Sequence, residues 1–83
     1  MKTKLKGNPY KTKKREQYSN LPEFIHIQNL KRIRKELNIS QSEFAPKLET
    51  KHQTFVCWEL GYNIPRFDKF LQWCQLLGYN PFQ

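Results

Sequence analysis

The chain has 83 residues, of which 37% are hydrophobic, and this is enough for one compact domain with a small core. No apolar run approaches the roughly 20 residues that a membrane-spanning helix needs, and the basic N-terminus lacks the apolar stretch of a secretory signal. The sequence also lacks paired catalytic carboxylates, a Ser/His/Asp set and a phosphate-binding glycine loop. We therefore expect a cytoplasmic protein that is not an enzyme and binds no cofactor.

The two cysteines, Cys57 and Cys74, are too few for a secreted disulfide scaffold. Together with His26 and His52 they match no metal-ligand spacing, so no metal site is expected. We expect two reduced thiols, with at least one of them packed in the interior as a small hydrophobic side chain.

The formal charge of +8 is concentrated near the N-terminus. Residues 1–22 contain seven basic side chains and one acidic side chain, a net charge of +6, whereas residues 23–83 carry a net charge of only +2. We interpret residues 1–20 as a flexible basic arm that precedes a domain at 21–83. Such an arm suits a polyanion, most commonly nucleic acid, although a solvated tail without a partner has the same composition.

Clear helical periodicity follows an ambiguous segment at 21–27, which fits either a short strand or an early helical turn. Leu30, Ile33 and Leu37 recur at helical spacing among basic residues and predict a first helix over about 28–37. Asn38 readily adopts the left-handed conformation that ends a helix, so we expect the helix to stop there.

A capping box predicts the start of the second helix, because the Ser40 hydroxyl can cap the free amides while Glu43 reaches back three residues. Pro46 lies inside this helix, removes one backbone hydrogen bond and costs roughly 3 kcal/mol in a regular helix interior. We therefore expect a short or kinked second helix. Its inward-facing residues are Phe44, Ala45 and Leu48.

The third predicted helix, over 51–60, has two different faces when its residues are placed at intervals of about 100°. Phe55 and Trp58, together with Thr54, form a bulky apolar face that should be buried. Gly61 ends this helix. The opposite face is mixed and open, and it consists of His52, Gln53, Val56 and Cys57.

A fourth helix over about 66–77 is stopped by Gly78 and Pro81. Its apolar stripe consists of Phe67, Phe70, Leu71, Cys74 and Leu77. Three further residues near the C-terminus either complete the core or form a dimer surface, namely Trp73, Tyr79 and Phe82. Because no convincing pair of strands is present, the sequence predicts an all-α fold with four to five helices.

Two short helices joined by a tight turn, the second with one buried and one open face, are typical of a helix-turn-helix. The sequence resembles the Cro/C1-type (XRE) helix-turn-helix domain of phage repressors and bacterial regulators. The residues that carry the resemblance are Ile-Ser-Gln-Ser-Glu-Phe-Ala-Pro-Lys-Leu at 39–48, Thr-Phe-Val-Cys-Trp-Glu-Leu-Gly at 54–61, and Pro65. The resemblance covers about residues 28–78 and implies a lambda-repressor-like fold that binds double-stranded DNA in the cytoplasm of a bacterial or phage-infected cell.

The resemblance also implies roles for individual residues. In this family the third helix commonly reaches base edges from the positions of His52, Gln53 and Cys57, and Val56 on the same face suits a thymine methyl group. Phosphate contacts are implied for Gln41, Lys51 and Arg66, and the charge pattern adds Lys31, Lys35, Lys11, Lys13, Lys14 and Arg15. Arg34 and Glu59 match a family ion pair that ties the first helix to the end of the third. For the contact residues, the alternative is an exposed side chain without a ligand.

The sequence departs from the family pattern at the turn between the second and third helices. Glu49 stands where the family usually has a glycine, at a position where a positive φ is often needed. Pro46 interrupts a helix that is normally intact, and Lys51 is a poor N-cap residue. These departures leave the fold in place, but a displaced turn would re-aim the side chains that read the bases.

The sequence thus predicts a sequence-specific DNA-binding transcriptional regulator, a Cro-like or autoregulatory repressor that reads the major groove with the helix at 51–60. A domain of this size makes few base contacts, so we expect a homodimer on a palindromic operator. Few residues follow the fourth helix, so we expect no ligand-sensing domain and no small-molecule ligand. Two alternatives stay open: a protein-interaction module such as an antitoxin or phage-encoded inhibitor, and a sequence-neutral nucleic-acid binder that relies on the arm.

Overall fold

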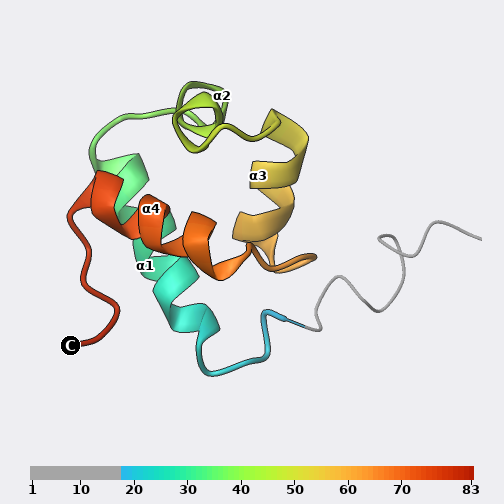
Figure 1. The fold of residues 1–83 in the computed structure, drawn as a ribbon, viewed down its shortest axis with the longest axis vertical. Helices are drawn as coiled ribbons and strands as arrows, with labels where there is room; N and C mark the ends of the chain where they lie inside the picture. Colours follow the sequence, from blue (N-terminus) through green and yellow to red (C-terminus); the bar gives the residue numbers. More distant parts are fainter. Residues whose placement is uncertain (1–17) are drawn as a thin grey trace, which may run out of the picture.

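Four α-helices and one short 3-10 helix account for the regular structure of residues 18–83, the part of the chain that the computed structural model describes (Figure 1). The elements are, in chain order, α1 (Phe24–Glu36), α2 (Gln41–Phe44), the 3-10 helix η3 (Ala45–Leu48), α3 (His52–Leu60) and α4 (Phe67–Leu77). No strand occurs between residues 18 and 83, which confirms the predicted all-α class. None of the helices in this range has the length and apolar character needed to cross a membrane.

The first helix, α1, begins at Phe24, earlier than the predicted start at about residue 28. The amides of Phe24 and Ile25 donate to the carbonyls of Leu21 and Pro22, three residues before them, at 2.9 and 3.2 Å. These tight bonds wind the segment at 21–27, which was ambiguous in the sequence, into a turn that continues as helix.

The buried stripe of α1 also differs from the expected one. It consists of Phe24, Ile27, Leu30 and Arg34. Leu37 was expected to face the core, but it is the C-cap residue and is 56% exposed. The reason is that Asn38 adopts a φ of 60° and turns the chain away, as expected for the stop, so the helix ends before Leu37 can reach the interior.

The second helix is short, as predicted, because Pro46 changes its winding. The α-helical part, α2, ends at Phe44, and the chain continues as the 3-10 helix η3 with the proline in its first turn. Proline lacks the amide that would extend the α-helical hydrogen bonding. The predicted inward-facing residues of this segment are all buried, namely Phe44, Ala45 and Leu48.

Aromatic rings from three elements meet in the centre of the domain. The ring centroid of Phe55 on α3 lies 5.4 Å from that of Phe44 on α2 and 5.0 Å from that of Trp73 on α4. Trp73 has 0% exposure, so it completes the core and cannot belong to a dimer surface, one of the two roles left open for it. Such aromatic contacts hold α2, α3 and α4 in one packed unit.

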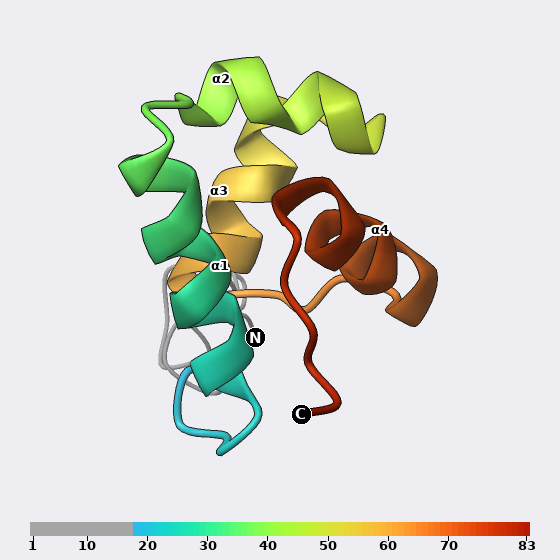
Figure 2. The same cartoon turned by 90° about the vertical axis from the view of Figure 1, so that its left-hand side faces the viewer.

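The apolar stripe of α4 agrees with the prediction at Phe70, Cys74 and Leu77, which belong to the core or pack against it, but not at the start of the helix. Phe67, the first residue of the helix, was expected in the core but is 65% exposed. The fully buried residues are Trp73 and Cys74, because the side chains at the start of α4 project beyond the edge of the core. After α4 the chain returns beside α1 (Figure 2), where the Tyr79 hydroxyl is hydrogen-bonded to His26 Nδ1 at 2.7 Å.

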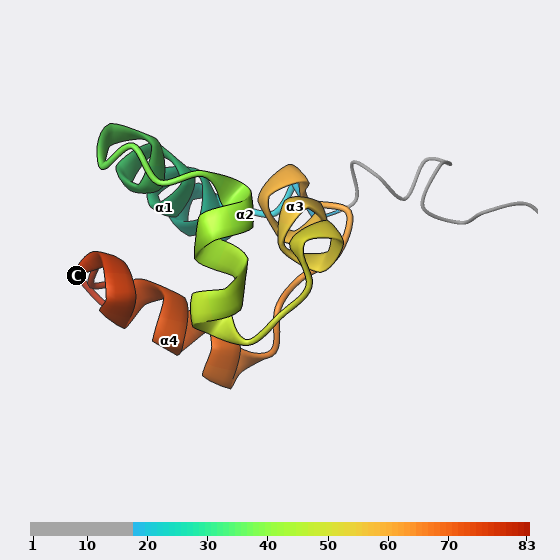
Figure 3. The same ribbon diagram turned by 90° about the horizontal axis from the view of Figure 1, so that it is seen from above.

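The arrangement of the helices exposes one end of α3. The unit formed by α2 and η3 crosses one end of the domain, with α1 and α4 on one side of it and α3 on the other (Figure 3). α1 packs against α3 and α4, and η3 also packs against both of those helices. The N-terminal end of α3 therefore emerges beside the α2–η3 unit, at the edge of the domain.

Candidate nucleic-acid interface

The third helix presents a polar first turn to solvent while its middle is anchored in the core. Phe55 and Trp58 are buried, as predicted, and Phe55 lies against the core aromatic rings. His52 and Gln53 are exposed, and Val56 is half-buried on the same side. The anchoring of α3 by its apolar face thus leaves the amide of Gln53 and the imidazole of His52 free to meet a ligand outside the domain.

Cys57 does not share this exposure, which corrects the expectation that it faces outward with Gln53. Only 9% of its surface is accessible. The backbone after α3 closes the C-terminus of the helix, where the amides of Tyr62 and Asn63 both approach the Cys57 carbonyl, at 3.0 and 3.5 Å. A helical wheel places a side chain on a face but does not include tertiary packing, so we remove the buried Cys57 from the predicted base contacts.

The N-terminus of α3 is electropositive. Lys51 is its N-cap residue, with an extended backbone, and makes no side-chain capping bond among the residues that the structure describes. The first turn contains no acidic residue. The first amides of a helix lack intrahelical partners and carry the positive end of the helix dipole, which favours phosphate groups. The Lys51 ammonium adds to this charge, next to the exposed Gln53.

The C-terminal turn of α3 is fixed by a buried ion pair. Arg34 Nε donates to Glu59 Oε2 at 2.8 Å and Arg34 Nη2 donates to Glu59 Oε1 at 3.0 Å. The two side chains are 5% and 0% exposed. Arg34 also donates to the carbonyl of Ile39, so its guanidinium joins α1, the loop before α2 and α3. The structure therefore brings together the pair that the family resemblance implies.

Gln41 extends this network from the start of α2. Its Nε2 donates to Glu59 Oε1 at 2.8 Å, and the side chain is half-buried. Glu59 consequently accepts three hydrogen bonds, two from Arg34 and one from Gln41, which is the satisfaction that a buried carboxylate requires. The structure thus gives Gln41 a supporting role for α3, while its predicted phosphate contact stays a prediction.

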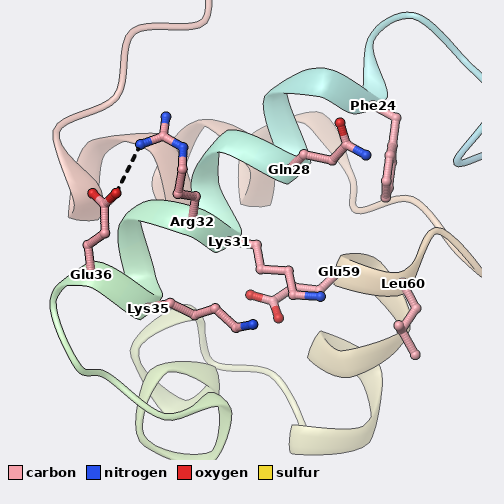
Figure 4. A pocket seen from close by; sticks show the side chains of 8 residues that line it. All are labelled: Phe24, Gln28, Lys31, Arg32, Lys35, Glu36, Glu59 and Leu60. Carbon is pink, nitrogen blue, oxygen red and sulfur yellow. Dashed lines mark hydrogen bonds and ion pairs between the residues drawn. The ribbon is translucent and has the colours of Figure 1, made fainter.

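Two of the predicted phosphate contacts, Lys31 and Lys35, line a hollow of about 560 Å³ between α1 and α3. Figure 4 shows both side chains extending from α1 over this hollow, with Glu59 and Leu60 on the α3 side. They therefore lie beside the last turn of α3, roughly 9 Å along the helix axis from Gln53 at 1.5 Å per residue. The structure separates these lysines from the electropositive N-terminus of α3.

Arg66 lies in the exposed segment just before α4 and is paired with Asp68. Its Nε and Nη2 donate to the two carboxylate oxygens of Asp68 at 3.3 and 3.0 Å. The hydrogen bonds from Arg66 hold the pKa of Asp68 below its ordinary value. Solvent screens this exposed ion pair, so a phosphate can compete with Asp68 for the guanidinium.

Four predicted phosphate contacts cannot be placed, because they belong to the part of the chain before residue 18: Lys11, Lys13, Lys14 and Arg15. The proposed boundary of the arm at residue 20 stays a prediction. Between residues 18 and 83 no group of three His, Cys, Asp or Glu residues could hold a metal ion.

Sequence reasoning missed two polar residues that reach the turn before α3 from the other side of the domain. Lys69 Nζ donates to the carbonyl of Leu48 at 2.7 Å, and Gln72 Nε2 donates to the carbonyl of Lys47 at 3.4 Å. Both donors belong to α4, some twenty residues away in the chain. Their only signal in the sequence is a polar position on a helix, which most often indicates a solvated face.

Comparison with known families agrees with this geometry. The sequence model of a family described as a helix-turn-helix domain matches residues 27–82, which include most of α1 and all the later helices. Searches of curated proteins and of solved structures found no match. Membership of this family supports a general role for the chain as a DNA-binding regulator. The chain belongs to the helix-turn-helix family, in its XRE/Cro-like type.

Proposed function

We propose that this chain is a sequence-specific transcriptional regulator, a Cro-like or autoregulatory repressor that acts on DNA in the cytoplasm of a bacterial or phage-infected cell. The observation that carries the proposal is the orientation of α3. Phe55 and Trp58 anchor the helix while His52 and Gln53 protrude from its first turn. This is the arrangement that a helix needs to enter the major groove with its N-terminal residues against base edges.

The proposed base-reading residues are His52, Gln53 and Val56. The Gln53 side-chain amide can donate to adenine N7 and accept from adenine N6. Val56 offers apolar contact to a thymine methyl group. Phosphates on either side would be bound by Lys51 with the free amides of α3, by Gln41 and Arg66, and by Lys31 and Lys35 near the other end of the helix.

A selection of bound sequences from a random duplex pool tests this proposal directly. We expect the selected duplexes to share a sequence that contains an adenine at one fixed position. The preference for this adenine should disappear in Gln53→Ala, because one bidentate base contact contributes about 1–3 kcal/mol of discrimination. Gln75→Ala, which changes an exposed glutamine on α4, is the matched control and should retain the preference. A pool that shows no enrichment with the unaltered protein would reject sequence-specific binding.

The basic arm adds affinity without discrimination in this proposal. Its charges release counterions from the duplex, so deletion of residues 2–15 should reduce the slope of log K against log salt by about 4–5 units if five or six charges engage. The sequence preference in the selection should remain. An unchanged affinity and slope after the deletion would remove the arm from the DNA interface, whereas loss of all binding would favour the sequence-neutral alternative.

We further propose that two copies bind a palindromic operator. The three base-reading side chains of one domain cover few base pairs, and two domains related by a twofold axis would double the contacts. The enriched sequence should then contain inverted half-sites whose centres are about 10–10.5 base pairs apart, or a multiple of this. A single asymmetric site, bound by one copy in sedimentation measurements on the duplex, would contradict the dimer.

A protein-interaction module, such as an antitoxin or a phage-encoded inhibitor, is the second candidate. It is favoured by a mostly apolar groove of about 570 Å³ between the turn before α1, the α3–α4 loop and the C-terminal residues. Phe67 and Phe82 on this groove are strongly exposed. A preferred duplex in the selection, retained by Phe67→Ser and Phe82→Ser, would favour the regulator. No preferred duplex together with a stable protein complex that these variants abolish would favour the module.

A further inference from the structure

Each of the four carbonyls of η3 accepts a hydrogen bond from outside the helix. The last carbonyls of a helix have no partner within it and need partners from elsewhere. The amide of Glu49 donates to the Pro46 carbonyl at 2.9 Å, and the amide of Thr50 donates to the Ala45 carbonyl at 3.2 Å. These two backbone bonds close the turn in the way that a left-handed C-terminal residue permits.

The remaining two carbonyls are satisfied by side chains of α4. Lys69 Nζ lies 2.7 Å from the Leu48 carbonyl oxygen, and Gln72 Nε2 lies 3.4 Å from the Lys47 carbonyl oxygen. The Lys69 side chain is only 24% exposed, and its ammonium, which donates to the Leu48 carbonyl, also lies 3.7 Å from Glu49 Oε1. The shorter bond also carries the positive charge, which makes it the stronger of the two.

The residue types in this turn do not favour its geometry. Glu49 adopts φ 56° and ψ 41°, a left-handed conformation that favours glycine, so the residue type works against the geometry. Lys51, which follows two residues later, provides no side-chain cap for α3 within the described part of the chain. The position of the α3 N-terminus therefore depends on contacts from outside the turn.

We propose that Lys69 is a positioning residue for DNA recognition, whose ammonium fixes the end of η3 and thereby aims the first turn of α3. Only three residues separate Leu48 from His52. Because this connection is short, a shift of the Leu48 carbonyl would also move Gln53. Base contacts require side chains placed to within about half an ångström. The inference rests on the proposed function and names Lys69 as a residue on which the sequence specificity of DNA binding depends.

The position of Lys69 also distinguishes this role from a phosphate contact. A lysine that binds phosphate contributes similarly to all duplexes, and its removal lowers the salt slope by about one unit. A lysine whose ammonium is bound to the protein backbone should leave that slope unchanged. Its removal should instead weaken the preferred duplex more than a scrambled one.

The test uses Lys69→Met, which keeps the length and packing of the stem and removes the ammonium. We expect affinity for the selected duplex to fall at least tenfold, affinity for a scrambled duplex to change less than twofold, and the salt slope to stay constant. Lys69→Arg retains a charged donor and should restore most of the affinity. Lys47→Met removes an exposed lysine of the same turn and should not lower the ratio of specific to non-specific affinity.

Amide hydrogen exchange provides a readout that does not need DNA. In Lys69→Met the Thr50 amide should exchange at least tenfold faster, while the core amides of α1 stay protected. If Lys69→Met does not fold, Gln72→Leu removes the second donor to the same turn and should change specificity and exchange in the same direction.

Three outcomes would overturn the inference: equal weakening of both duplexes with a lower salt slope, unchanged binding in Lys69→Met, or unchanged exchange at Thr50. If the unaltered protein prefers no duplex, the proposed function fails. The hydrogen exchange result then decides separately whether Lys69 holds the turn.

Discussion

The guanidinium of Arg34 and the carboxylate of Glu59 meet edge to edge at 2.8 and 3.0 Å, and this contact connects α1 to the last turn of the proposed recognition helix. Removing one charge leaves the other buried without compensation. We expect Glu59→Gln to lower the free energy of unfolding by about 3–5 kcal/mol, measured by urea denaturation.

The matched control is the exposed pair between Arg32 and Glu36 on α1, whose Nη1 and Oε2 atoms are 3.3 Å apart. Glu36→Gln should cost less than about 1 kcal/mol, because solvent screens this pair. Similar losses from the two substitutions would contradict the argument that burial makes the Arg34–Glu59 contact important.

The capping box at Ser40 predicts a dependence of stability on pH. The Ser40 amide donates to Glu43 Oε1 at 2.9 Å, and the Glu43 amide donates to the Ser40 hydroxyl at 3.1 Å. The hydrogen bonds from Ser40 hold the pKa of Glu43 below its ordinary value in the folded state. The stabilisation is therefore complete above the ordinary pKa and is lost as pH falls through the lowered one.

Unfolding curves at a series of acidic pH values measure this contribution. Ser40→Ala should cost about 1 kcal/mol near neutral pH because it removes the N-cap acceptor. Glu43→Gln should reduce the loss of stability with falling pH relative to the unaltered chain. A Glu43→Gln protein with the same acid profile would show that the carboxylate makes no pH-dependent contribution.

The two glycines that end α3 and α4 should respond differently to alanine. Both have a positive φ, 85° at Gly61 and 69° at Gly78. A Cβ on Gly61 would lie 2.8 Å from the Ser19 Cβ and 3.0 Å from its backbone nitrogen, whereas a Cβ on Gly78 would meet nothing within 4 Å.

Gly78→Ala should therefore cost only the left-handed strain, about 1–2 kcal/mol. Gly61→Ala should cost about 1–3 kcal/mol more, because the turn around Ser19 must also move. Thermal or urea unfolding of the two variants measures the difference. Equal costs would show that residues around Ser19 do not pack against the end of α3.

Both cysteines are buried free thiols, and burial raises the pKa of Cys74. We expect neither thiol to react within minutes with Ellman's reagent at pH 8 in the native protein, and both to react at once in urea. The absorbance of the released thiolate measures the reaction. Rapid labelling of Cys57 in the native state would return this residue to the exposed face of α3 and to the candidates for base contact.

The sequence predicted the helices well where local chemistry determines them. The capping box, the chain reversals at Asn38 and Gly61, and the shortening by Pro46 each depend on residues that are neighbours in the chain. Phe55 and Trp58 were also predicted correctly, because their spacing places both on one face of the helix and both are buried.

The errors in the prediction have a common physical origin in contacts between distant segments. Leu37 and Phe67 have the apolar character of core residues but lie where a helix passes the edge of the core. Cys57 was expected on the open face of α3 but is buried. Lys69 bonds to a carbonyl twenty-one residues earlier in the chain, and no local pattern in the sequence indicates that contact.

The anchoring of α3 separates two sets of residues that evolution can alter independently. The side chains that hold the helix, Phe55, Trp58 and Glu59, are buried, whereas His52 and Gln53 at its start carry little of the folding energy. If α3 reads DNA as we propose, substitutions at the exposed positions should change the target site with little effect on thermal stability. Duplicated copies would diverge first in the outward residues of this one helical turn.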